Sequence, residues 1–324
     1  MEKIRIGILG AADIAYRRFL PALQKHEGFT YIGVASQSGK RVEEFQRQYG
    51  GVVFSDYEKL LDCQEIDSVY IPLPPALHYK WGRKVLEAGK HVLLEKPFTT
   101  NEEDTNMLVK IAGEKNLTVF ENYMFLYHRQ LEQIMKIWKE NWLGNIHQIS
   151  IRFGFPERQK DDFRYNKELG GGALLDCGGY TLRLATEFLD KETIRVATSS
   201  MVYQDTQVDL FGAITLEDKN GTVANLSFGM ANEYKCELQI WGQKGFLETD
   251  RIFTAPEDWK PVIHITKEGK EEIIELEGDN QFYNSINQFY KCVNNKQIRG
   301  GIYKEILKQS ELMEKVLEGG TYAL

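Results

Sequence analysis

The sequence predicts an α/β protein with an N-terminal doubly wound parallel sheet and a C-terminal α+β domain containing a largely antiparallel open sheet. Over the first 120 or so residues, short β-branched runs alternate with amphipathic stretches. After about residue 122, strand-like runs follow one another through short turns, with few helices between them. Because strand–helix alternation implies parallel pairing through right-handed crossovers, we expect the domains to span residues 1–121 and 122–324.

The predicted elements of the first domain follow from hydrophobic periodicity. Apolar residues at helical spacing indicate helices, and short β-branched runs bounded by glycine or polar residues indicate strands. The expected strands span 3–9, 29–36, 52–55, 68–73, 91–96 and 117–123. The expected helices span 13–26, 38–50, 57–63 and 78–89, with one more between the last two strands.

The second domain is predicted to be mostly strands. They span 145–155, 195–204, 208–217, 222–230, 236–242, 245–250 and 262–269. Helices near 172–189, 280–294 and 302–317 are expected to cover one face of this sheet. Asn220-Gly221, between two of the strands, is a hairpin signal. The face left without helices predicts a homo-oligomer, a dimer or tetramer, formed through the sheet.

The composition of the chain argues against several classes of protein, among them nucleic-acid-binding, membrane and secreted proteins. The formal net charge of −7 argues against broad attraction to nucleic acid or to an anionic membrane. No apolar run approaches the roughly 20 residues that cross a bilayer, and the N-terminus lacks the features of a signal peptide. The cysteines are scattered without a CxxC pair, and the histidines lack metal-ligand spacing. We therefore expect a cytoplasmic protein without disulfides or a metal site.

A glycine turn follows the first strand and opens the first helix. Aligned to the dinucleotide fingerprint GxGxxG/A of the Rossmann fold, it reads Gly10, Ala11, Ala12, Asp13, Ile14 and Ala15. Gly10 fits the tight turn and Ala15 fits the small-residue position of helix–sheet packing. Ala12 departs from the pattern where glycine lets the backbone approach a pyrophosphate. An ordinary strand–turn–helix is the alternative, and the βαβ context favours a nucleotide site.

The end of the second strand indicates which nucleotide. An NAD site places Asp or Glu there to bind the ribose 2′-hydroxyl. This chain has Ser36, Gln37 and Ser38, followed by Lys40 and Arg41. Hydroxyls and cations favour a 2′-phosphate that a carboxylate would repel, so the sequence predicts NADP(H). The two cations as ordinary solvated residues remain the alternative.

With "IPLPPALHYKWGRKVLEAGKHVLLEKP" and "GGGALLDCGGY" added to the fingerprint, the chain resembles the glucose–fructose oxidoreductase/inositol dehydrogenase family over nearly its full length. Within it, the motifs look most like nucleotide-sugar 3-ketoreductases. In this family the EKP segment, here Glu95-Lys96-Pro97, lies where nicotinamide and substrate meet, and its Lys-Pro bond is often cis. The resemblance makes Lys96 a catalytic and ligand-binding candidate, with Glu95 beside the cofactor.

Tyr180 is the proton donor that the resemblance implies. Many family members have histidine at this position, whereas the ketoreductases resemble this chain in having tyrosine. Reduction of a ketone needs an acid for the alkoxide, and the Lys96 cation would make a tyrosine a better donor. Asp176, four residues earlier on the predicted helix, would share the face of Tyr180 and is a further catalytic and cofactor-binding candidate. A core aromatic with a capped hydroxyl is the alternative for Tyr180.

Further site residues are implied by the same resemblance. The cofactor candidates are Tyr57, Leu73, His78 and Arg164. The substrate candidates, besides Lys96 and Tyr180, are Tyr234 and Thr254. A surface position is the alternative for Arg164, and a satisfied helix-start histidine is the alternative for His78.

These features predict an NADPH-dependent oxidoreductase that reduces the 3-keto group of a nucleotide-linked deoxysugar. An NADP-dependent dehydrogenase of a free sugar or a trans-dihydrodiol is the first alternative. A non-catalytic NADP-sensing regulator of the same fold is the second, and the presence of both Lys96 and Tyr180 argues against it.

Overall fold

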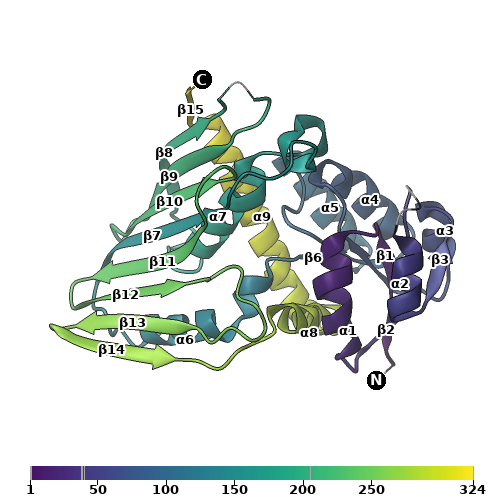
Figure 1. Cartoon of the computed structure of the whole chain (residues 1–324), viewed down its shortest axis with the longest axis horizontal. Coiled ribbons are helices and arrows are strands. Elements are labelled where there is room, and N and C mark those ends of the chain that lie inside the picture. Colours follow the sequence, from purple (N-terminus) through teal and green to yellow (C-terminus); the bar gives the residue numbers. More distant parts are fainter. Residues whose placement is uncertain (1, 38, 40, 205, 324) are drawn as a thin grey trace. The chain divides into compact units, whose positions relative to one another are not determined.

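The backbone of the protein divides into two compact units. A computed structural model describes residues 2–37, 39, 41–204 and 206–323 (Figure 1). The first unit runs to Tyr123 and also contains Phe282–Ser310, and the second contains Met124–Gln281 and the chain from Glu311 onward. The sequence-based boundary at 121/122 assigned 282–310 to the second domain. This segment joins the first unit because its apolar face packs there: the Phe289 ring lies 6.1 Å from Phe29 and 5.8 Å from Phe120.

Within the described residues, the first unit is built on a six-stranded parallel sheet of order β3-β2-β1-β4-β5-β6. Its strands are β1 Ile4–Leu9, β2 Phe29–Ala35, β3 Val52–Phe54, β4 Ser68–Ile71, β5 His91–Leu94 and β6 Val119–Glu121. All of β4 is buried, as expected for a central strand covered on both faces, and the edge strand β6 is buried as well. The order reverses direction beside β1, which is where doubly wound sheets bind ligands.

The helices of the first unit begin and end where local chemistry predicts. They are α1 Leu20–Gln24, α2 Val42–Tyr49, α3 Tyr57–Asp62, α4 His78–Glu87, α5 Glu102–Glu114, α8 Gln281–Asn294 and the first part of α9 Lys296–Glu318. A π-helical turn, Ala15–Phe19, precedes α1. The Asp56 carboxylate accepts from Lys59 N at 2.7 Å at the start of α3, and Asn101 does the same for Asp104 N at the start of α5.

The second unit contains, within its described residues, a nine-stranded sheet of order β14-β13-β12-β11-β7-β10-β9-β8-β15. Its strands are β7 Ile146–Gly154, β8 Arg195–Val202, β9 Phe211–Glu217, β10 Val223–Gly229, β11 Lys235–Gly242, β12 Gly245–Asp250, β13 Val262–Lys267, β14 Lys270–Glu275 and β15 Gly320–Ala323. The β7–β10 and β15–β8 pairs are parallel and the others are antiparallel. The Asn220-Gly221 hairpin is confirmed by the β9–β10 register.

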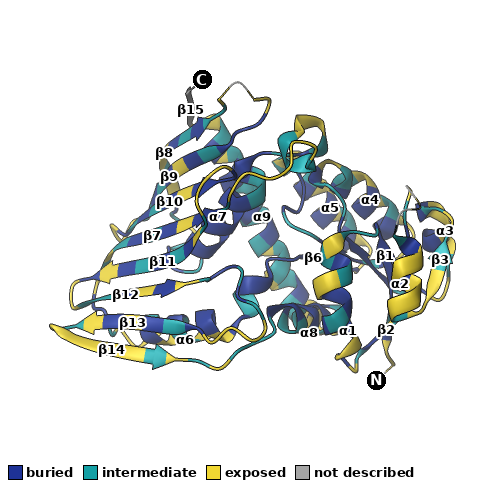
Figure 2. Cartoon of the chain, in the orientation of Figure 1, coloured by how far each residue is buried: buried dark blue, intermediate teal, exposed yellow. Residues whose placement is uncertain are grey.

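One face of this sheet is buried and the other is open (Figure 2). Burial alternates along β11, where Cys236, Leu238 and Ile240 are buried, as in a sheet with one solvated face. The buried face packs against α7, Gly179–Ala185, which contacts β7 and β10. A π-helical turn, Leu174–Gly178, leads into α7.

Three elements were missed by the sequence prediction. The helix α6, Arg129–Lys139, lies in the part of the chain that was expected to be mainly strands. The strands β14 and β15 were not predicted either. β14 is almost wholly exposed and carries consecutive charges, so it lacks the alternation that identifies a half-buried strand. Searched over the described residues, none of the helices is both long and apolar enough to cross a membrane.

Candidate active site

The glycine turn after β1 has the backbone that the fingerprint requires. Gly10 has φ +111°, a conformation that favours glycine, and its N–H donates to Ala35 O at 2.9 Å. A Cβ at this position would lie 2.7 Å from Leu73 Cδ2. Ala15 is fully buried in the first turn of the helix. Gly10 therefore lets the turn approach Leu73, which follows β4, as the tight turn of the dinucleotide fingerprint requires.

The end of β2 presents hydroxyl, amide and cationic side chains. Arg41 has φ +63°, and its guanidinium lies 3.4 Å from an Asp13 carboxylate oxygen and 3.2 Å from that of Glu44. It also lies 5.3 Å from the centre of the Tyr16 ring. Exposed ion pairs of this kind are weak, so a phosphate can replace the carboxylates as partner of Arg41. The predicted contributors Ser38 and Lys40 lie outside the described residues.

Tyr57 connects α3 to the end of β2. The side chain is buried, and its ring meets the Trp81 ring edge-on at 4.7 Å. Burial raises the pKa of Tyr57, while a hydrogen bond from the Gln37 backbone opposes the rise. Tyr57 therefore packs directly beneath the residues that were predicted to bind the adenosine end.

His78 ties two loops together at the ends of β4 and β5. Its Nδ1 lies 2.8 Å from Pro97 O, and its Nε2 lies 2.8 Å from Leu73 O. A neutral imidazole has one N–H, so it donates to one carbonyl at a time. Burial lowers the pKa of His78, and its hydrogen bonds to backbone carbonyls oppose the effect. His78 thereby fixes the Leu73 backbone relative to Pro97.

The EKP segment is anchored on both sides of Lys96. The Lys96–Pro97 peptide bond is cis, as the family resemblance implied. On one side, Glu95 Oε1 accepts from Tyr70 Oη at 2.6 Å and from Asn122 Nδ2 at 2.7 Å. Burial raises the pKa of Glu95, and these two hydrogen bonds oppose the rise. On the other side, Phe98 N donates to the buried Glu121 carboxylate at 2.7 Å.

The sequence analysis missed the residues that hold Glu95. Asn122 Oδ1 accepts from Ser285 Oγ at 2.7 Å, and the Tyr70 ring stacks on Phe19 with centroids 3.8 Å apart. Ser285 is 163 residues from Asn122. These partners come from elements distant in sequence.

Tyr180 lies in an aromatic pocket of the second unit. The side chain is 6% exposed, and its ring centroid lies 5.8 Å from that of Phe125, 5.2 Å from Phe153 and 5.4 Å from Phe253. Its hydroxyl lies 3.8 Å from Met124 Sδ. Three aromatic neighbours hold the ring, so the position of the hydroxyl is set by packing.

Asp176 and Arg164 form an ion pair in the same unit. Arg164 Nε donates to Asp176 Oδ2 at 2.6 Å, and its Nη1 lies 3.2 Å from Asp162 Oδ1. The two carboxylates neutralise the charge of the Arg164 guanidinium. Arg164 is therefore better suited to position Asp176 than to bind a phosphate. Asp176 lies in a π-helical turn, where the α-helical i, i+4 relationship to Tyr180 assumed in the sequence analysis does not apply.

The glycine run and Asp209 build the start of this helix. Gly171 and Gly172 allow close approaches, because Cβ atoms there would lie 2.3 Å from Arg164 O and 2.4 Å from Asp209 Oδ1. The Asp209 carboxylate accepts from Leu174 N at 2.6 Å. Burial raises the pKa of Asp209 to about 6, while the hydrogen bond from Leu174 opposes the rise. Asp209 was not predicted, since it comes from the loop before β9.

Tyr234 and Thr254 are brought together as a hydroxyl pair. Tyr234 Oη lies 2.6 Å from Thr254 Oγ1, and Thr254 Oγ1 lies 3.6 Å from Cys236 Sγ. Burial raises the pKa of Tyr234 to about 12, so its hydroxyl is protonated at neutral pH. Thr254 adjoins Phe253, whose ring packs against Tyr180, so these predicted substrate contacts and Tyr180 belong to one cluster.

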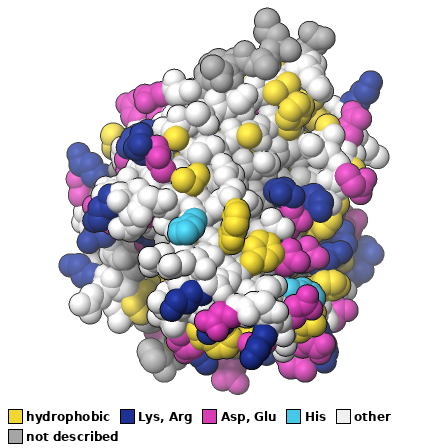
Figure 3. All heavy atoms as spheres, turned by 90° about the vertical axis from the view of Figure 1, so that its left-hand side faces the viewer, with side chains coloured by type: hydrophobic (Ala, Val, Ile, Leu, Met, Phe, Trp, Pro, Cys, Tyr) yellow, Lys and Arg dark blue, Asp and Glu magenta, His cyan; other side chains and the backbone are white. Residues whose placement is uncertain are grey.

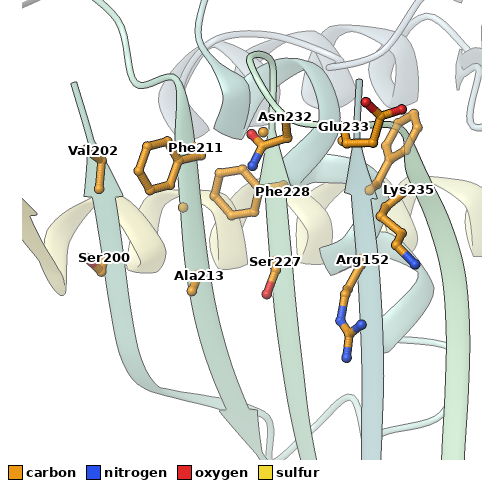
Figure 4. A pocket seen from close by; sticks show the side chains of 14 residues that line it. Arg152, Ser200, Val202, Phe211, Ala213, Ser227, Phe228, Asn232, Glu233 and Lys235 are labelled. Atoms are coloured by element: carbon orange, nitrogen blue, oxygen red, sulfur yellow. The ribbon is translucent and has the colours of Figure 1, made fainter. Parts of the chain in front are cut away.

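A separate hollow of about 450 Å³ lies on the sheet of the second unit (Figure 4). Its lining includes Arg152, Ser227, Glu233 and Lys235, together with glycines of β7, β9 and β10. None of the predicted site residues lines it. In the described part of the chain, no group of three or more His, Cys, Asp or Glu side chains is arranged to hold a metal ion.

Two family models match the chain in the order of its two predicted domains. A model described as an oxidoreductase family with an NAD-binding Rossmann fold matches residues 4–123. The GFO/IDH/MocA C-terminal domain model matches residues 131–248. The chain belongs to this oxidoreductase family. The resemblance inferred from the motifs is confirmed, and the protein is an oxidoreductase with the expected fold class.

Individual relatives are similar over almost the whole chain. The dTDP-3,4-didehydro-2,6-dideoxy-alpha-D-glucose 3-reductase of Saccharopolyspora spinosa is 36% identical, covering 97% of each chain. The crystal structure of KijD10, a 3-ketoreductase from Actinomadura kijaniata in complex with NADP and TDP-benzene, has a TM-score of 0.95 and 35% identity, covering 99% of each chain. The D-xylose 1-dehydrogenase (NADP(+)) 2 of Haloferax volcanii is 29% identical, covering 77% of this chain and 76% of its own.

Proposed function

We propose that this protein is an NADPH-dependent ketoreductase that reduces the 3-keto group of a nucleotide-linked deoxysugar. The observation that carries the proposal is the full-length similarity to a deoxysugar 3-reductase, at 36% identity over 321 residues. The presence of Lys96 and Tyr180 supports it. The scattered free cysteines are consistent with a reducing cytoplasm, where such a reductase would act.

The first unit fits the adenine dinucleotide phosphate. The φ of +111° at Gly10 supports a close approach of the pyrophosphate to the helix start. Ser36 and Arg41 would bind the 2′-phosphate. The ion pairs of Arg41 with Asp13 and Glu44 would then break. Leu73, His78 and Glu95 would line the nicotinamide end. When bound, NADPH supplies the hydride that the reaction requires.

In the second unit, Tyr180 would donate the proton that neutralises the alkoxide. A nearby cation stabilises the phenolate that remains after a tyrosine gives up its proton, so the Lys96 ammonium would make Tyr180 a better donor. Asp176 is paired with Arg164 at 2.6 Å, so its carboxylate acts as an acceptor and suits substrate positioning better than proton donation.

A substrate panel followed at the nicotinamide absorbance tests this function. It contains nucleotide-linked 3-keto-deoxysugars, free sugars and trans-dihydrodiols, each with NADP(H). The expected result is the highest kcat/KM with a nucleotide-linked keto-sugar and NADPH. Higher kcat/KM on a free sugar or a dihydrodiol would replace this proposal with the dehydrogenase alternative. Binding of NADPH with no turnover on any member would favour the non-catalytic regulator.

A further inference from the structure

Arg251 is the feature of the second unit that no part of the proposed reaction has used. It follows β12 with φ +50°, in the left-handed region that non-glycine residues seldom adopt. Its guanidinium lies 5.4 Å from the centre of the Tyr234 ring and 4.9 Å from that of Trp259. Two aromatic faces therefore hold this cation in a defined position.

The guanidinium of Arg251 has no carboxylate partner. Among the described residues, no acidic side chain lies within ion-pair distance of it. Arg164, another arginine of this unit, already pairs with Asp162 and Asp176. An arginine has five N–H donors in a planar fork that matches the geometry of a phosphate. Arg251 is therefore the arginine of this site that can accept an anionic ligand without breaking an existing ion pair.

The backbone around Arg251 is anchored at both ends. Gln130 Nε2 donates to Asp250 O at 2.8 Å, and Gln281 Nε2 donates to Ala255 O at 3.0 Å. Between them, Phe253 is fully buried, and its N–H donates to Cys236 Sγ at 3.3 Å. This segment is a pre-organised part of the unit, which lowers the ordering cost of binding a ligand.

A second hydrogen-bond donor lies beside the cation. The Tyr234 ring contacts Arg251, and its hydroxyl pairs with Thr254 at 2.6 Å. When Thr254 donates to Tyr234, the phenolic hydrogen of Tyr234 points away from the pair and can be donated to an anion. Phe253, between Arg251 and Thr254 in sequence, packs against Tyr180 at 5.4 Å. The cation and hydroxyl pair therefore share a packed segment with the proposed proton donor.

We propose that Arg251, held over Tyr234 and Trp259, binds the diphosphate of the substrate together with the Tyr234–Thr254 hydroxyl pair. Arg251 then selects nucleotide-linked sugars over free sugars, because a free sugar leaves the guanidinium without an anion. This inference rests on the proposed function for its choice of ligand. It assigns the recognition of the diphosphate to the second unit, apart from the residues proposed to bind NADPH.

Calorimetric titration of the NADP-loaded protein tests the assignment without turnover. The probes are dTDP, UDP and thymidine, which lacks phosphates. Arg251→Gln should weaken binding of the diphosphate probes by about 10- to 100-fold, as expected for a lost charged hydrogen bond, and change thymidine binding less than twofold. Arg251→Lys should restore part of the loss. Arg251→Asn, which tolerates the left-handed backbone, should repeat the loss if Arg251→Gln folds poorly.

The control is Arg195→Gln, an exposed arginine of β8 paired with Glu217, which should leave every affinity unchanged. Diphosphate affinities of Arg251→Gln and Arg251→Asn equal to those of the wild type would overturn the proposal. So would failure of the wild type to bind either diphosphate.

Measurements of turnover distinguish failure of the diphosphate site from failure of the proposed function. If Arg251→Gln loses diphosphate binding but the wild type reduces no nucleotide-linked keto-sugar, the diphosphate site stands and the proposed function fails. If the wild type reduces that sugar and Arg251→Gln keeps its KM, the function stands and the diphosphate site fails.

Discussion

At the residue scale, the proposed proton donor Tyr180 and the proposed cation Lys96 can each be tested by substitution. Tyr180→Phe keeps the ring in contact with Phe125, Phe153 and Phe253 but removes the acidic proton. We expect kcat to fall by about 10²–10⁴-fold, the usual contribution of a general acid. NADPH affinity, measured by fluorescence titration, should stay almost unchanged. Near-wild-type kcat on the true substrate would remove Tyr180 from the role and leave Asp176 as the candidate acid.

Lys96→Met tests whether the two residues act as a unit. The substitution keeps the length of the side chain and removes its charge, so kcat should fall because the tyrosine loses its cation. Combined with Tyr180→Phe, the loss should be smaller than the product of the two single losses, since groups that act together are non-additive. A fully multiplicative loss in steady-state assays would mean that the two side chains act independently.

We propose that side chains at the end of β2 determine the choice between NADPH and NADH. Ser36→Asp places a carboxylate where NAD-binding proteins have one, and it would repel a 2′-phosphate. We expect the wild type to bind NADPH more tightly than NADH and the variant to shift toward NADH. Fluorescence titration gives both dissociation constants. Equal constants for NADPH and NADH in the wild type would refute the proposed preference.

At the scale of elements, His91 joins β5 to β6. Thr118 N donates to His91 Nδ1 at 2.9 Å, a bond that requires the neutral ring. Burial, helped by Arg299, lowers the pKa of His91 to about 4. An unfolded histidine titrates near 6.5, so between pH 6.5 and 4 the unfolded chain binds more protons and the free energy of unfolding falls as pH falls. By pH 5 the loss from His91 should be about 2 kcal/mol.

Urea unfolding at pH 7.5 and pH 5 measures this effect. His91→Gln retains an acceptor for Thr118 but does not titrate, so its stability should fall less between the two pH values than that of the wild type. The exposed His147→Gln is the matched control and should follow the wild type. The same pH dependence in all three proteins would show that His91 does not titrate in this range.

Asp209 stabilises the start of the helical segment that carries Asp176 and Tyr180, because its carboxylate accepts a hydrogen bond from Leu174 N. Asp209→Ala leaves the buried Leu174 N–H without its acceptor, which should cost about 1–3 kcal/mol in the free energy of unfolding. Asp209→Asn keeps an acceptor oxygen and should cost less. The exposed Asp161→Ala serves as control. Unfolding in urea gives all three values, and a change below 0.5 kcal/mol in Asp209→Ala would contradict the assigned role, since about that size is expected of an ordinary surface substitution.

At the scale of the whole molecule, the open face of the second sheet exposes apolar side chains that a second copy of the chain could bury. Trp241 and Ile273 are 59% and 57% exposed. Alternation along β11 places Trp241 on the unburied face, and the strand register from β14 to β11 places Ile273 on the same face. Figure 3 shows hydrophobic side chains interspersed with both signs of charge on the side of the molecule that it draws. We propose that the protein is a homodimer or homotetramer formed through this sheet.

Light scattering at micromolar concentration tests the oligomer. The wild type should have a mass of two or four chains, and Trp241→Glu combined with Ile273→Glu should lower it toward one chain. Val52→Glu changes a similarly exposed apolar residue in the first unit and should leave the mass unchanged. A single-chain mass for the wild type would contradict the proposal.

The fold class was predictable because it depends on local periodicity. Strand–helix alternation, the glycine turn at Gly10 and the Asn220-Gly221 hairpin are properties of short segments, and each is present in the structure. The EKP motif could also be recognised because it is contiguous, although the residues that anchor it could not. These local patterns, together with the family motifs, also named Tyr180, Tyr234 and Thr254 before any contact was known.

Only the tertiary structure determined which residues these side chains contact. The aromatic pocket of Tyr180 and the hydrogen bond from Leu174 to the Asp209 carboxylate both depend on segments far apart in sequence. Phe282–Ser310 joins the first unit for the same reason, since its periodicity identifies a helix but not the sheet that the helix covers. Periodicity records which face of a segment is apolar, and the neighbour that buries that face is selected only when the whole chain packs.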